Sequence, residues 1–152
     1  MARLGTPDVK FELKSEARRA VLRVDPTEKP GLVLLGTRGP AALAVGALGP
    51  MGLLLIYTYF ITVADRSLYV HRGPRLRNRP EELVHVIPRD QTGGLVARVK
   101  RGKARNALYL RLPGKARPTR LNVSYHSRDE LERFLREFPE GGVRAEGARS
   151  AR

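Results

Sequence analysis

Few side chains in this sequence could catalyse a reaction, and those that could are scattered. The histidines, His71, His85 and His126, do not recur at the short spacing that metal sites use. Cysteine is absent, which excludes thiol catalysis, disulfides and cysteine-ligated zinc. Gly93-Gly94 lacks the remaining residues of a phosphate-binding loop. The sequence therefore predicts a protein that is not an enzyme and that uses no metal or cofactor.

Positive charge is the most informative chemical feature of the chain. Its 152 residues include 29 Lys and Arg against 15 Asp and Glu, a formal net charge of +14. Such an excess attracts polyanions: nucleic acid, anionic lipid or an acidic protein surface. Composition does not distinguish between them, and a solvated basic surface without a dedicated ligand is the alternative interpretation.

The basic residues form two clusters. One follows a predicted hairpin, and the other lies on three predicted strands and the turns beside them. Alternation along the strands places the second cluster on one outer face, with Tyr109 as its only aromatic residue, a thin platform for stacking bases. The candidate anion- or lipid-binding residues are Arg72, Arg75, Arg77, Arg98, Lys100, Arg101, Lys103, Arg111 and Arg120.

A long uncharged stretch separates Arg38 from Asp65, and its last part is predicted to be a strand. Tyr57–Val63 alternates β-branched and aromatic residues, and Ser67–His71 alternates again. We expect a β-hairpin with Asp65 and Arg66 as a structural turn, in which the short acid accepts backbone amides.

The remaining apolar part, Pro40–Ile56, is short for a membrane span. As a helix it would measure about 25 Å against a hydrocarbon core of roughly 30 Å. Gly49-Pro50 interrupts it, and both flanks are basic, which argues against a single crossing. Three hypotheses remain open: a connection packed on the sheet or at a dimer interface, a hairpin in one leaflet, and a true span.

Helices are predicted at both ends of the chain. Thr6-Pro7-Asp8 is a helix start, and Asp25-Pro26 ends that helix before a linker. Ser127 and Glu130 have the spacing of a capping box, in which each side chain binds the other's backbone amide. The helix that follows has an apolar face, which we expect to be buried against the sheet. That face consists of Leu131, Phe134, Leu135 and Phe138.

Between the helices, short runs separated by turn residues predict an antiparallel meander. Besides the hairpin, the predicted strands are Leu32–Thr37, Glu82–Pro88, Leu95–Lys100, Ala107–Leu112 and Thr119–Tyr125.

This order of elements resembles the bacterial pleckstrin-homology-like (PH-like) proteins over about Gly31–Phe138. Their hairpin signature corresponds to Ala64-Asp65-Arg66-Ser67-Leu68, with Ala64 in place of the usual Thr and Ser67 in place of the second Arg. The resemblance implies a mainly β fold with α: a bent antiparallel sheet or partly open barrel capped by a C-terminal amphipathic helix. We expect three parts in the chain. They are an N-terminal helix and linker (1–30), the PH-like domain (31–138) with its apolar insert (40–56), and a disordered basic tail (139–152).

We therefore expect a binding module that associates with an anionic membrane surface or a protein partner through its basic face and apolar segment. Nucleic-acid binding through the same face is the alternative, and self-association through residues 40–56 is left open. The N-terminus has no apolar signal region, which predicts a cytoplasmic location, including the inner face of the cell membrane.

Overall fold

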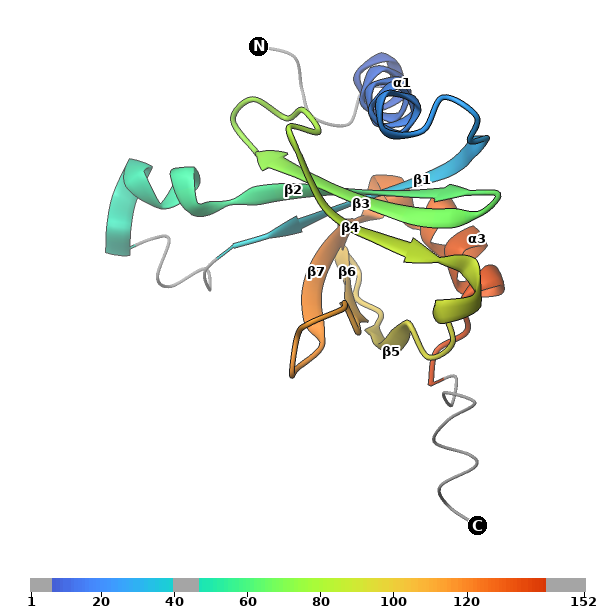
Figure 1. Cartoon of the computed structure of the whole chain (residues 1–152). Coiled ribbons are helices and arrows are strands. Elements are labelled where there is room, and N and C mark those ends of the chain that lie inside the picture. Colours follow the sequence, from blue (N-terminus) through green and yellow to red (C-terminus); the bar gives the residue numbers. More distant parts are fainter. Residues whose placement is uncertain (1–6, 40–46, 142–152) are drawn as a thin grey trace.

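The computed structural model describes residues 7–39 and 47–141, in which seven antiparallel strands form one curled sheet (Figure 1). The strand order is β4-β3-β2-β1-β7-β6-β5. The strands are β1 (Pro30–Arg38), β2 (Tyr57–Ala64), β3 (Ser67–Pro74), β4 (Glu82–Pro88), β5 (Val96–Lys100), β6 (Arg105–Leu110) and β7 (Thr119–Ser124). The helices are α1 (Pro7–Val24) and α3 (Arg128–Glu137), with 3₁₀ turns η1 (Gly49–Leu55), η2 (Arg89–Gln91) and η3 (Tyr125–Ser127). The predicted class, mainly β with a helix at each end, is confirmed.

The predicted hairpin is present as β2 and β3. Ile61 lies opposite Val70 and Val63 opposite Leu68, which leaves Asp65 and Arg66 as the connection. Two residues are the commonest length for a hairpin connection, and this one fixes the register of the two strands.

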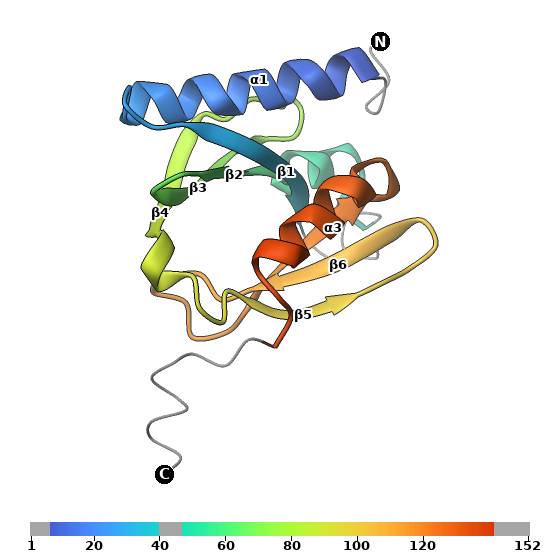
Figure 2. The same cartoon turned by 90° about the vertical axis from the view of Figure 1, so that its right-hand side faces the viewer.

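The main hydrophobic core lies between the curled sheet and α3 (Figure 2). Leu131 and Phe134 of α3 are fully buried against Ile61, Leu108 and Leu121 of the sheet. The expectation that the apolar face of the C-terminal helix packs on the sheet is confirmed. A helix placed there removes the open side of the sheet from water.

The other face of β1 and β2 is covered by α1 (Figure 2). Ala17 packs on Val33 and Phe60, and all three side chains are buried. Residues Thr58 to Ala64 of β2 are consequently buried on both faces of the strand. Although the sequence places residues 1–30 outside the β domain, α1 and the sheet form one packed unit.

The predicted capping box of α3 is wrong. Ser127 is the N-cap residue, but its side chain makes no capping hydrogen bond. The carboxylate of Glu130 instead pairs with Lys10, at 2.7 Å, and with Lys14, both from α1. Charged donors bind a carboxylate more strongly than a neutral backbone amide does, so the contact between the helices replaces the local cap.

The segment predicted as a disordered tail begins in contact with the sheet. Glu140 accepts a hydrogen bond from the Val99 amide at 2.9 Å, and the Gly141 amide donates to the Val96 carbonyl at 3.1 Å. These bonds cover the edge strand β5, which would otherwise expose unpaired backbone groups. Residues 142–152 lie outside the described part of the chain.

Candidate functional site

An apolar protrusion extends from the sheet between β1 and β2 (Figure 1). We call residues 47–57, which include η1, the apolar tip. Met51 is 64% exposed, the highest value among the large apolar residues described in the tip. The other exposed apolar side chains of the tip are Leu48, Leu54, Leu55 and Tyr57. Exposed apolar side chains that follow one another in this way add nothing to the core and are typical of interaction surfaces.

Glycines shape the tip and its base. Gly49 begins η1 with a φ of 60°, a left-handed conformation that costs an L side chain energy. A Cβ atom on Gly39 would lie 2.9 Å from the Cγ1 atom of Ile56, so glycine lets the two sides of the base approach closely. Beside that base, Arg38 is paired with Tyr57 in the β1–β2 ladder.

The structure describes only the second half of Pro40–Ile56, and that half does not form a membrane-spanning helix. Residues 40–46 lie outside them, whereas 47–56 form η1 and its flanks instead of a continuous α-helix. Within the described chain, no helix has the length and apolar character needed to cross a bilayer.

The β3–β4 loop lies beside the apolar tip and brings positive charge to it. The Arg75 amide donates to the Ile56 carbonyl at 3.0 Å. A Cβ atom on Gly73 would lie 1.8 Å from the Arg79 carbonyl oxygen, so only glycine lets this loop fold back on β3. The loop also exposes Leu76, which is 64% exposed. We call the arginines of this region the basic collar: Arg38, Arg72, Arg75, Arg77 and Arg79.

Two members of the basic collar are paired with carboxylates. Arg72 contacts Glu82 at 2.7 Å, and its guanidinium lies 5.4 Å from the centre of the Tyr57 ring. The pKa of Arg72 is raised, mainly by the hydrogen bond to Glu82. Arg77 contacts Glu81 at 3.2 Å. The Arg77 side chain is 71% exposed despite its ion pair, whereas that of Arg72 is 36% exposed, and ion pairs at the surface are weak.

The second predicted cluster is partly assembled by the structure. Arg98, Tyr109 and Arg120 lie directly opposite one another on β5, β6 and β7, and Lys100 follows on the same face of β5. The Arg98 guanidinium lies 4.6 Å from the centre of the Tyr109 ring. The hydrogen bond from Arg98 is the main cause of the lowered pKa of Tyr109. We call these four residues the basic strand face.

Two other candidates have structural contacts. Arg111 lies beyond the end of β6, not on the strand as predicted, and its side chain donates to the Gly94 carbonyl at 2.8 Å. Arg101 pairs with Glu132 of α3. Lys103 is exposed in the β5–β6 turn. Arg111, which was predicted on the strand face, therefore contacts the β4–β5 loop, and Arg101, which was predicted on the adjoining turn, contacts α3.

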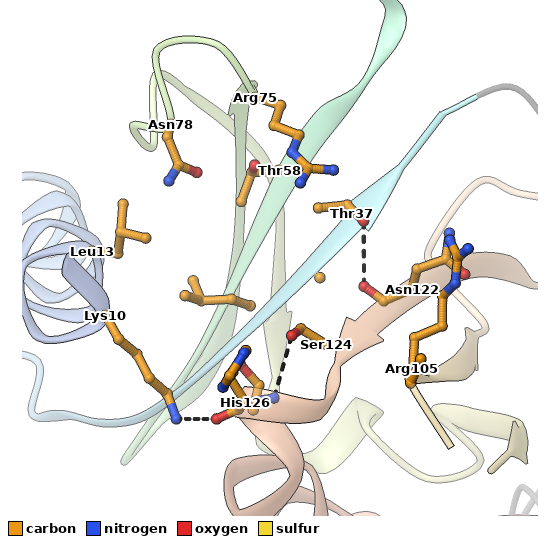
Figure 3. A pocket seen from close by; sticks show the side chains of 14 residues that line it. Lys10, Leu13, Thr37, Thr58, Arg75, Asn78, Arg105, Asn122, Ser124 and His126 are labelled. Carbon is orange, nitrogen blue, oxygen red and sulfur yellow. Dashed lines mark hydrogen bonds between the residues drawn. The ribbon is translucent and has the colours of Figure 1, made fainter. Parts of the chain in front are cut away.

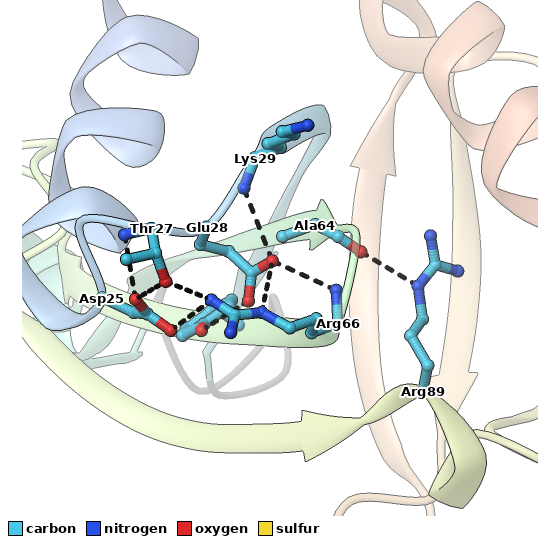
Figure 4. A network of polar contacts seen from close by, with 8 residues as sticks. Asp25, Thr27, Glu28, Lys29, Ala64, Arg66 and Arg89 are labelled. Carbon is cyan, nitrogen blue, oxygen red and sulfur yellow. Dashed lines mark hydrogen bonds and ion pairs between the residues drawn. The ribbon is translucent and has the colours of Figure 1, made fainter.

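Arg66 has a structural role at the hairpin turn (Figure 4). Its side chain donates to Asp25 at 2.7 Å, and its amide donates to Glu28 at 3.1 Å. Asp65 is exposed, and among the described residues the carboxylate that accepts the turn amide is Glu28 rather than Asp65. The turn is thereby tied to the segment between α1 and β1.

Glu28 was missed as a structural residue because the sequence around it has the composition of a linker. It also accepts the Tyr69 hydroxyl at 3.0 Å. Burial, followed by this bond to Glu28, raises the pKa of Tyr69 to about 12. Burial alone would raise the pKa of Glu28, but hydrogen bonds from Arg66 and Tyr69 outweigh it, and the pKa is lowered.

The described residues contain no group of three or more side chains suited to hold a metal ion. Comparison with known proteins found no matching family model, curated protein or solved structure. The apolar tip with its basic collar is the most distinctive surface feature of the described residues.

Proposed function

We propose that this protein is a non-catalytic, PH-like binding module that docks on an anionic membrane surface. The apolar tip inserts among the lipids at the interface, while the basic collar contacts their headgroups. The observation that supports this is the position of the β3–β4 loop, which is held against the tip by the bond from Arg75 to Ile56. The loop that carries three of the collar arginines thus contacts the base of the apolar tip.

The energetic contributions of the two parts are complementary. Complete burial of a large aliphatic side chain contributes about 1.5–3 kcal/mol, and partial insertion at the interface contributes less. Each arginine near an anionic leaflet contributes about 1 kcal/mol. Stable anchoring at a membrane generally requires two signals, and a protruding apolar segment beside a basic patch provides both.

Nucleic-acid binding through the basic strand face is the alternative. Arg98, Lys100 and Arg120 are exposed and could neutralise phosphates. However, the guanidinium of Arg98 covers one face of the Tyr109 ring, and a stacked base would compete with it. This geometry disfavours Tyr109 as a platform for stacking bases.

Co-sedimentation with vesicles tests the proposal. We expect the protein to pellet with vesicles of phosphatidylglycerol and phosphatidylcholine, to remain in the supernatant with phosphatidylcholine alone, and to be released by salt. The double variant Met51→Ser with Leu54→Ser should weaken binding at least tenfold, since it removes apolar side chains that contribute about 1.5 kcal/mol or more each when buried. The matched control is Phe11→Ser, which changes an exposed apolar residue of α1 and should bind normally.

A second pair of variants separates the two basic surfaces. Arg77→Gln with Arg79→Gln, both exposed in the basic collar and outside any described cavity lining, should reduce vesicle binding, whereas Arg98→Gln with Arg120→Gln should leave it nearly unchanged. Vesicle binding that is insensitive to the tip variant and to lipid charge would contradict the proposal. Tight DNA binding that is lost only in the Arg98 and Arg120 variant would instead support the nucleic-acid alternative.

A further inference from the structure

A cavity of about 280 Å³ lies on the outer side of the sheet, beneath the first turns of α1 (Figure 3). Lys10 and Leu13 of α1 line one side of it. Leu35 and Thr37 of β1 and Thr58 of β2 line another. The cavity is thus separated from the main core by the sheet and does not include the residues of the apolar tip.

The cavity forms where β1 and β7 meet. The two strands are paired at Thr37 and Asn122, near the end of β1. A Cβ atom on Gly36 would lie 3.1 Å from the Leu121 Cβ atom, so glycine allows this close crossing. Beyond the crossing, Ser124 and His126 turn away toward α3 and complete the wall.

Two buried polar groups on the wall have no hydrogen-bond partner among the described residues. Thr58 is only 4% exposed, and its Oγ1 atom is unpaired. The Oδ1 atom of Asn122 is buried and unpaired in the same way. Buried polar groups in native proteins are nearly always satisfied, so an orphaned hydroxyl on a cavity wall indicates that a ligand or water binds there.

All the charged side chains that line the cavity are positive. Its lining includes Lys10, Arg75 and Arg105 but neither Asp nor Glu. Lys10 pairs with Glu130 and donates to the His126 carbonyl. Within the described chain, Arg75 and Arg105 have no carboxylate partner, and they reach the cavity from the β3–β4 loop and from the start of β6.

We propose that this cavity binds a small organic phosphate. Two arginines from separate elements can bind several oxygens of one phosphate in the bidentate manner that guanidinium groups favour. The Thr58 hydroxyl and the Asn122 amide are placed for the polar part of the same molecule, and Leu13 and Leu35 for its carbon atoms. The volume is near the lower limit of about 300–1,000 Å³ that is typical of ligand sites, so the ligand is small.

This site lies outside the apolar tip and shares one residue, Arg75, with the basic collar. Binding of a free phosphate probe in the absence of vesicles tests it separately from the proposed membrane docking. The same phosphate chemistry is found in a soluble metabolite and in the headgroup of an anionic lipid. The experiment therefore has one arm for each source, with glycerol 3-phosphate as the soluble probe and phosphatidic acid vesicles as the lipid probe.

The first measurement is a calorimetric titration of the whole protein with glycerol 3-phosphate at constant ionic strength. We expect saturable binding, with no binding of glycerol. Thr58→Val should weaken it about tenfold, as expected for the loss of one hydrogen bond to a charged ligand. Thr62→Val is the matched control, because Thr62 is also buried on β2 with an unpaired Oγ1 atom but does not line the cavity.

Two double variants test whether the arginines that line the cavity bind the phosphate. Arg75→Gln with Arg105→Gln should reduce binding by more than Thr58→Val does. Arg98→Gln with Arg120→Gln removes the same charge from the basic strand face and should weaken binding less than Arg75→Gln with Arg105→Gln does, because neither Arg98 nor Arg120 lines the cavity.

The results distinguish a soluble phosphate from a lipid headgroup as the ligand, and they can also overturn the proposal. Binding of glycerol 3-phosphate that depends on Thr58 assigns a soluble ligand. Preference for phosphatidic acid over phosphatidylglycerol vesicles that Thr58→Val removes, without binding of the free probe, assigns a lipid headgroup. The proposal is overturned if neither probe binds, or if Thr62→Val and Thr58→Val weaken binding equally.

Discussion

Glu28 holds the connection between α1 and β1 against the hairpin turn. It is 5% exposed and accepts hydrogen bonds from the Tyr69 hydroxyl and the Arg66 amide. Glu28→Ala should lower the free energy of unfolding by about 1–3 kcal/mol, because the buried Tyr69 hydroxyl and the partly buried Arg66 amide lose their acceptor. Urea denaturation measures this effect. Glu82→Ala, which removes an exposed ion pair with Arg72, should cost at most about 1 kcal/mol, and an equal loss in the two variants would contradict the assigned role.

His71 should make stability depend on pH. It is 3% exposed, and burial, with a smaller effect from Arg23, lowers its pKa. Below about pH 6.5 the unfolded chain binds a proton that the folded chain does not, so stability is complete above that pH and decreases as the pH falls.

Comparison of the free energy of unfolding at about pH 7.5 and pH 5.5 tests this effect, since carboxylates titrate at lower pH. His71→Gln should reduce the dependence, whatever its effect on absolute stability, and the remainder includes His85, whose pKa is also lowered mainly by burial. The control His126→Gln changes an exposed histidine and should retain the wild-type slope. Identical slopes in wild type and His71→Gln would show that His71 does not cause the dependence.

At the scale of single elements, α3 should be essential for stability. Phe134 is fully buried, and its ring centre lies 4.8 Å from that of Phe138. Phe134→Ala should cost about 3–5 kcal/mol, enough to unfold a domain of ordinary stability. Arg136→Ala changes an exposed residue of the same helix and should shift stability by less than about 0.5 kcal/mol. An unchanged melting temperature of Phe134→Ala would contradict this role.

The elements with strong local patterns could be predicted from the sequence. The β2–β3 hairpin follows from the alternation after Tyr57, and α3 follows from the spacing of Leu131, Phe134 and Phe138. The cap of α3 could not be predicted, because Glu130 binds lysines that are more than a hundred residues earlier in the chain. A local motif is overridden where a distant charged partner is available.

At the scale of the whole molecule, the sequence does not show which face of the sheet each helix covers. The sequence pattern does not show that α1 packs on Phe60, and the cavity beside Thr58 exists only because of that packing. Alternation along the strands was enough to predict that Arg98 and Arg120 lie on the same face of the sheet. The placement of Arg75 beside Ile56 required the folded β3–β4 loop.

Insertion of the apolar tip into lipid is tested most directly by a tryptophan at position 54, because the chain contains none. With Leu54→Trp, vesicles of phosphatidylglycerol and phosphatidylcholine should shift the fluorescence to the blue, and brominated lipids should quench it. Phe11→Trp, at an exposed position of α1, should show neither change. Leu54→Trp emission that does not respond to anionic vesicles, or that responds no more than Phe11→Trp, would contradict docking through the tip.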